Sequence, residues 1–153
     1  IIQDIGVCNE DVADIKETWQ TVYNNERAGI LLFETLFEMY PHYDTYFVKF
    51  RTEGQKSLFD NPKFIHHVKI RVMDALNDII VNLENDERLV NILETVGKNH
   101  KKRNLKKQEF INIGKVVIET LRKALGTSFT PKREEAWTKV INCAMETMGK
   151  VTG

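Results

Sequence analysis

Cysteine is scarce in this sequence of 153 residues. Cys8 and Cys143 are the only two, one near each end, and no N-x-S/T sequon occurs. Small secreted domains that depend on disulfides carry more cysteines than this, so we expect a reducing, cytoplasmic environment and two unpaired thiols. A single bridge between the two ends is the alternative.

Long apolar runs are also missing. No stretch approaches the roughly 20 apolar residues that span a bilayer, and the first residues lack the basic start and apolar core of a signal peptide. We therefore predict no membrane span. The chain begins at Ile1 rather than Met, so we expect a piece of a longer protein whose flanking segments could carry a lipid anchor.

Net charge is absent too, because Lys+Arg and Asp+Glu both number 22. A chain without an overall positive field does not attract a polyanion, so we predict no nucleic-acid partner. The sequence also lacks H-E-x-x-H, C-x-x-C, P-loop, G-x-S-x-G and G-x-G-x-x-G motifs, which removes the usual support for hydrolases and nucleotide-binding enzymes. Adjacent His66 and His67 cannot share a metal from one helix face, since that needs a spacing of three or four.

What the sequence does contain is helical periodicity along nearly its whole length. Apolar residues recur at three and four from Asp11 to about Asn24, from about Ile30 to Tyr40, and from Asn61-Pro62 to about Glu84. Further helices are predicted to end near His100 and near Gly126, and the last one begins at Thr130-Pro131. These patterns predict one all-α domain over residues 1–153, with six to eight helices and residues 1–10 as an irregular extension.

A histidine stands at the end of the fourth predicted helix. Leu89, Leu93 and Val96 form its apolar stripe, and His100 continues the stripe by four residues. The imidazole should therefore face the core. A strongly basic segment follows it, KKRNLKK at residues 101–107.

Aromatic residues gather after Pro41. Tyr43, Tyr46, Phe47 and Phe50 crowd into the segment PHYDTYFVKF, which is either a small aromatic core beneath a loop or the wall of a flat cofactor's pocket. A core-facing imidazole, an aromatic wall and nearby cations are the groups that a haem uses for its iron, its porphyrin and its propionates.

Over nearly its full length the chain resembles the globin family, including its invertebrate, neuroglobin-like and cytoglobin-like members. Trp19 matches the tryptophan of the first globin helix, and Pro41 matches the proline that opens the third. Phe47, six residues on, matches the haem-stacking phenylalanine. His100, preceded by VGKN, matches the proximal iron ligand. The resemblance implies a globin fold around haem b.

The same resemblance assigns the other contacts. Phe33 would overhang the distal pocket, and Val72 would be a distal aliphatic contact. Val96 and Leu105 would lie on the proximal side, while Arg71 and Arg103 would pair with the propionates.

The distal position is ambiguous by one residue. Counting forward from Phe47 or back from Leu76 puts Val68 there, whereas counting from Pro62 puts His67 there. A one-residue helix bulge would reconcile the two counts by turning His67 inward, and π-bulges occur at functional sites.

Two haem functions follow from this ambiguity, and a haem-free function stays open beside them. With His67 as sixth ligand, the bis-histidyl iron would serve electron transfer or redox and gas sensing, which we favour. With Val68 in the pocket, five-coordinate iron would bind oxygen, carbon monoxide or nitric oxide reversibly. A haem-free interaction module is the third alternative. Enzymatic activity is left open, since dioxygenases reuse this scaffold, and so is a homodimer.

Overall fold

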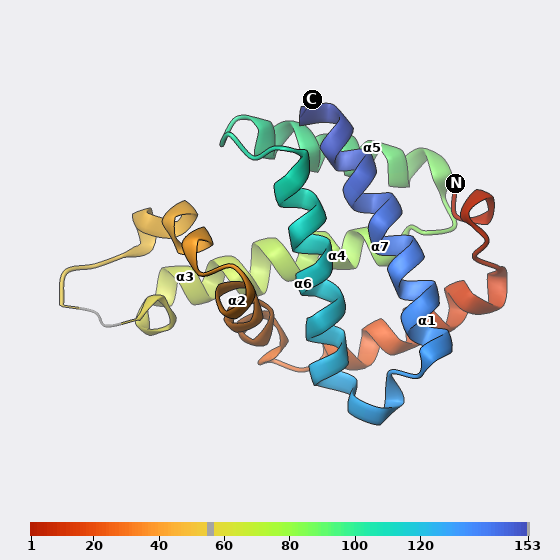
Figure 1. Ribbon diagram of the computed structural model, residues 1–153, viewed down its shortest axis with the longest axis horizontal. Coiled ribbons are helices and arrows are strands. Elements are labelled where there is room, and N and C mark those ends of the chain that lie inside the picture. The colour runs from red at the N-terminus through yellow and green to blue at the C-terminus, as the bar shows by residue number, and fades with distance from the viewer. Residues whose placement is uncertain (55–56, 153) are drawn as a thin grey trace.

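Helices account for nearly all of the regular structure in the computed structural model, which describes residues 1–54 and 57–152 (Figure 1). Its α-helices are α1 Asn9–Tyr23, α2 Ala28–Met39, α3 Pro62–His66, α4 Met73–Val81, α5 Asp86–Lys101, α6 Lys107–Leu125 and α7 Pro131–Thr152. The 3-10 helices are η1 Gln3–Ile5, η2 Pro41–Phe50, η3 Leu58–Asp60 and η5 Gly126–Ser128, and η4 His67–Val72 is a π-helix. The described residues contain no strand, so the predicted all-α class with six to eight helices is confirmed.

Local signals in the sequence set most of the boundaries. The apolar periodicity noted from Asp11 to about Asn24 forms the buried face of α1, which contains Val12, Ile15 and Trp19. The Asn61 side chain accepts hydrogen bonds from the backbone N–H groups of Lys63 and Phe64, which caps α3. One prediction needs correction, because the helix expected to run unbroken from Asn61 to about Glu84 is divided into α3, η4 and α4. Residues 1–10 hold η1 and the start of α1, and Ile2 and Val7 among them are buried.

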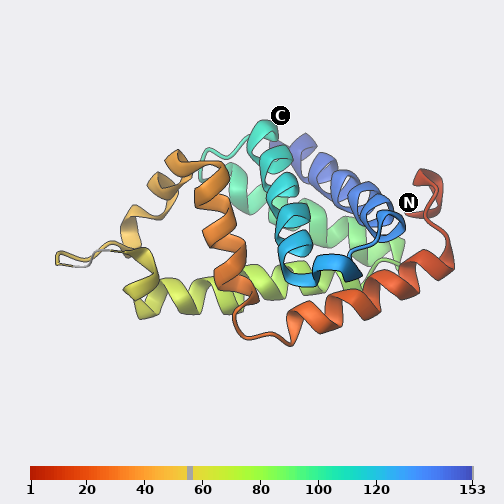
Figure 2. The same cartoon turned by 60° about the horizontal axis from the view of Figure 1, so that its bottom comes forward.

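The helices pack as crossed layers (Figures 1 and 2). Helices α6 and α7 lie side by side, and α5 crosses α7 at the end near the C-terminus. The rod formed by α3, η4 and α4 runs beneath them with α1 along its α4 end, and α2 packs between η4 and α6. Helices α5 and α7 cross closely at Gly97. A Cβ at this position would lie 2.7 Å from the Met148 carbonyl oxygen, so only glycine fits there without a shift.

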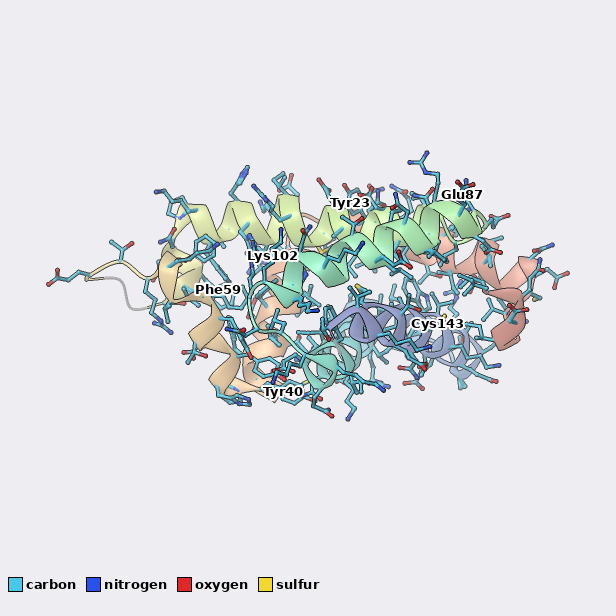
Figure 3. The ribbon with its side chains drawn as sticks, turned by 90° about the horizontal axis from the view of Figure 1, so that it is seen from above. Tyr23, Tyr40, Phe59, Glu87, Lys102 and Cys143 are labelled. Carbon is cyan, nitrogen blue, oxygen red and sulfur yellow. The ribbon has the colours of Figure 1, made fainter. Side chains whose placement is uncertain are left out.

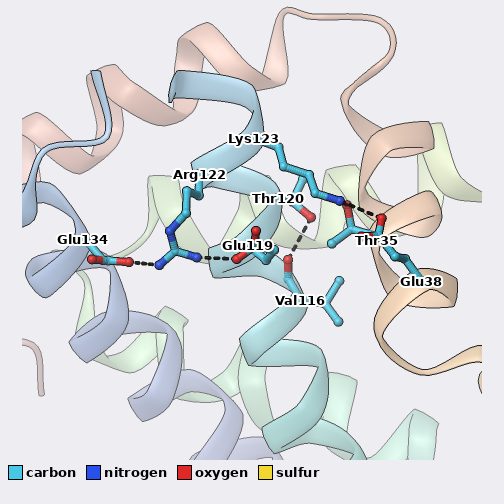
Figure 4. Close-up of polar contacts among 8 residues, drawn as sticks. All are labelled: Thr35, Glu38, Val116, Glu119, Thr120, Arg122, Lys123 and Glu134. Atoms are coloured by element: carbon cyan, nitrogen blue, oxygen red, sulfur yellow. Dashed lines mark hydrogen bonds and ion pairs between the residues drawn. The ribbon is translucent and has the colours of Figure 1, made fainter. Parts of the chain in front are cut away.

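Polar contacts tie α6 to its neighbours (Figure 4). The Lys123 ammonium donates to Glu38 at 3.0 Å and to the Thr35 hydroxyl at 3.3 Å, which joins α6 to α2. Arg122 pairs with Glu119 on its own helix and with Glu134 on α7. All of these charges are partly exposed, so each pair contributes only about 0–1 kcal/mol and mainly fixes orientation.

The structure bears on two expectations from the sequence. Cys8 and Cys143 are both free thiols, as predicted. None of the described helices is long and apolar enough to cross a membrane.

Candidate functional site

The backbone between α3 and α4 widens into a π-helix at His67–Val72. A π-turn takes up an extra residue, so it rotates the side chains before it relative to those after it. The bulge considered from the sequence is therefore present, and it begins at His67. His66 is exposed, His67 is half-buried and Val68 is 0% exposed. The Val68 carbonyl oxygen lies 3.1 Å from where a Cβ on Gly29 would be, so Val68 is pressed against α2.

Aromatic rings surround the His67 imidazole. Its centroid lies 6.2 Å from that of Phe47 and 5.3 Å from that of Phe50. Phe47 also meets Phe33 edge-on at 5.2 Å, so the structure brings three predicted residues, Phe33, Phe47 and His67, into one aromatic cluster. Tyr43, which accepts a 2.8 Å hydrogen bond from Asn112 of α6, anchors the segment that carries Phe47 and Phe50.

Burial lowers the pKa of His67 to about 4. The cations of Lys49, Arg103 and Arg71 act in the same direction, and His100 adds the last contribution. The imidazole is therefore neutral at pH 7 and keeps a lone pair on one ring nitrogen. Lys49, Arg71 and Arg103 come from three separate segments of the chain, and all three cations act on the same imidazole.

His100 is held differently, by a hydrogen bond within α5. Its Nδ1 lies 2.8 Å from the Val96 carbonyl oxygen, and because a carbonyl only accepts, Nδ1 carries the proton. Nε2 is then the nitrogen with the free lone pair, the arrangement that orients metal-ligating imidazoles. The Phe110 ring packs against His100 at a centroid distance of 5.7 Å and an angle of 66°.

The other predicted contacts differ in exposure. Val72, Val96 and Leu105 are partly buried, while Phe33 is 5% exposed and belongs to the core. Arg71 and Arg103 are exposed, as expected for side chains at a rim.

Sequence reasoning gave no site role to Lys49 or Asn61, and it left Phe50 open between a small aromatic core and a pocket wall. In the structure Phe50 packs near His67 at a tilted angle, and Lys49 lowers the pKa of His67. Asn61 donates a hydrogen bond to the Phe50 carbonyl while capping α3. The Phe47 and Phe50 rings stack at a centroid distance of 6.5 Å, although the backbone at Phe47 is not helical, so helical spacing alone could not have shown that contact.

The donor set fits haem. In residues 1–54 and 57–152, no group of three His, Cys, Asp or Glu side chains is placed to hold a metal ion. An iron held by a histidine of this site would therefore take most of its ligands from a group such as haem. Partly buried apolar side chains and rim cations beside the two imidazoles suit such a group.

Comparisons with known proteins place the chain in a family. The sequence model of the globin family matches residues 30–148. Cytoglobin-2 of Danio rerio is 30% identical over 130 residues, covering 83% of this chain and 72% of the relative. Cytoglobin-1 of Danio rerio is 29% identical over 150 residues, covering 95% of this chain and 86% of the relative. The chain belongs to the globin family.

A solved structure shares the fold. The crystal structure of a hexacoordinated haem protein from an anhydrobiotic tardigrade, at pH 4, matches with a TM-score of 0.85 and 20% identity, over 98% of this chain and 97% of that one. The predicted globin fold and haem cofactor are thereby confirmed, since haem with iron is the cofactor of this family.

Proposed function

We propose that this globin binds haem between His100 and His67 as its two axial ligands and acts in electron transfer or in redox and gas sensing. The single observation that carries the proposal is the π-helix, which begins at His67 and turns its ring toward Phe47 and Phe50. Without that extra residue in the turn, counting back from Leu76 along a regular α-helix would place Val68 at the distal position instead of His67.

The burial and protonation of His67 support the same role. A neutral imidazole, half-buried among phenylalanine rings, needs no proton loss before it binds a metal. The solved structure with a similar fold is described as a hexacoordinated haem protein, which agrees with two protein ligands on the iron.

Each residue would have a separate task at the site. Haem supplies the redox couple and the place where a diatomic gas can bind. The Val96 carbonyl fixes the His100 ring through Nδ1, which would leave Nε2 to bind the haem iron. Phe33 and Phe47 exclude water, and Arg71 and Arg103 offer cations to the propionates. A gas would have to displace His67, so the same ring would control access.

The test replaces each of the adjacent histidines in turn. His67→Ala should convert the ferrous spectrum of the haem-loaded protein from low-spin to high-spin, because one of two strong-field ligands is lost. His66→Ala is the matched control, since this neighbour is exposed. An unchanged spectrum in His67→Ala would favour the alternative of a five-coordinate globin that binds oxygen or another diatomic gas reversibly.

A further inference from the structure

The corner between α5 and α6 carries a dense group of cations. We call it the basic corner, and it consists of Lys98, Lys101, Lys102, Arg103, Lys106 and Lys107. Residues 98–107 contain no Asp or Glu, although the whole chain has a net charge of zero. The zero net charge therefore conceals a local positive region that is balanced by acidic residues elsewhere.

These cations are available to a partner. All six side chains are exposed, and in the described part of the chain none of them forms an ion pair. A hollow of about 540 Å³ lies among Thr95, Lys98, Asn99, Lys101 and Lys102. Lys102, labelled in Figure 3, follows the last turn of α5.

The helix dipoles account for only some of the cations in the basic corner. Lys98 and Lys101 lie in the last turn of α5, where cations are favourable. Lys106 and Lys107, however, are the N-cap and first residue of α6, where the positive end of the dipole disfavours them. Local stability therefore does not account for cations on both sides of the corner, which suggests that they serve an external anionic group.

The corner adjoins the candidate haem site. Arg103 belongs to it and, together with Lys49 and Arg71, lowers the pKa of His67. His100 lies within it along the chain. Two propionates would neutralise only two cations, so most of the charge remains for another molecule.

Apolar contacts would contribute little to the binding of a partner at the basic corner. The large apolar side chains that the described residues expose are Met39, Tyr46, Val48, Ile70, Val81 and Ile111, all outside residues 98–107. A membrane-bound face usually combines its charge with inserted apolar side chains, whereas charge complementarity is what steers the encounter of two proteins. The chemistry thus favours an acidic protein over a lipid surface.

We propose that the basic corner docks an acidic electron-transfer protein beside the haem. This inference rests on the proposed electron-transfer function. One electron would leave the reduced cofactor of the partner and reduce ferric haem to ferrous haem. Opposite charges would steer the encounter, so its rate should fall when salt is added. At 0.1 M, salt largely screens charges that are more than about 10 Å apart.

The experiment uses reduced flavodoxin, a small acidic flavoprotein, as the probe donor. The double variant Lys101→Glu/Lys102→Glu is compared with Lys63→Glu/Lys132→Glu, which changes the net charge equally at exposed positions without ion pairs in the described residues. The start of α7 lies at the opposite end of the molecule from the corner in Figure 1. Arg103 stays unchanged because it belongs to the haem site.

The corner variant should lose at least about tenfold in second-order reduction rate at low ionic strength, and the control much less. Calorimetric binding of oxidised flavodoxin should weaken in parallel. Equal rates in both variants, with intact low-spin spectra, would overturn the docking proposal alone. A high-spin spectrum in the unmodified protein would instead contradict the proposed function. Corner-dependent binding to phosphatidylserine vesicles, with flavodoxin reduction unaffected, would overturn the proposal in favour of a lipid surface.

Discussion

At the scale of single residues, the two histidines of the site are held by different forces. The His100 ring is oriented by a hydrogen bond from Nδ1 to the Val96 carbonyl, one helical turn earlier. The His67 ring is oriented by packing against Phe47 and Phe50. A ring held by packing alone is expected to leave more easily than one held by a hydrogen bond, so under the proposed ligation we expect a gas to displace His67 rather than His100.

The two cysteines should differ in reactivity. Cys8 is exposed, whereas Cys143 is partly buried and burial raises the pKa of its thiol. Only the thiolate reacts with alkylating reagents, so iodoacetamide should modify Cys8 several times faster at pH 7.5. Mass spectrometry of the native protein over time measures both rates. Equal rates would show that Cys143 is more accessible than the structure indicates.

The sequence predicted the direction of the His100 side chain but not that of the His67 side chain, for a physical reason. His100 continues an apolar stripe inside a regular α-helix, so periodicity alone gives its direction. His67 lies where the helix changes to π-turns, and a period of 3.6 residues no longer applies. The count back from Leu76 crosses this turn and the count from Pro62 does not, so these two counts disagree by one residue.

At the scale of helices, boundaries were predictable where a capping residue or proline marks them. Asn61-Pro62, Pro41 and Thr130-Pro131 each fall at or within one residue of an observed helix start. The helix that begins at Pro41 was expected only from the resemblance to globins, because its aromatic residues carry no α-helical stripe. Packing of Tyr43 and Phe47 onto neighbouring helices determines that conformation.

The close crossing of α5 and α7 makes Gly97 sensitive to substitution. In Gly97→Ala, the new Cβ would lie 2.7 Å from the Met148 carbonyl oxygen, and a backbone atom cannot rotate away. We expect a loss of about 1–3 kcal/mol in the free energy of unfolding, since overpacking outweighs alanine's better helix propensity. Urea denaturation measures the loss.

Gly114→Ala provides the control for this prediction. Its Cβ would meet the Met145 Cγ at 3.1 Å, and a flexible methionine side chain can move aside. This variant should stay within about 1 kcal/mol of the unmodified protein. If both variants lost the same stability, the α5–α7 crossing would not be the tight contact described above.

At the scale of the whole molecule, haem should be part of the stability of the fold. A cofactor that binds only the native state stabilises it by about 4 kcal/mol when free ligand exceeds Kd a thousandfold. Removing haem should therefore lower the Tm by about 10 °C in a domain of this size. Calorimetry of the loaded and haem-free protein measures the shift. Identical Tm values would favour a haem-free interaction module.

The most direct test of the central claim is the optical spectrum of the reduced protein before and after carbon monoxide is added. With His67 and His100 both on the iron, the reduced form should show sharp, split low-spin bands, and carbon monoxide should replace His67 only slowly. A broad high-spin spectrum that converts at once would mean an open sixth position, and it would contradict bis-histidyl ligation.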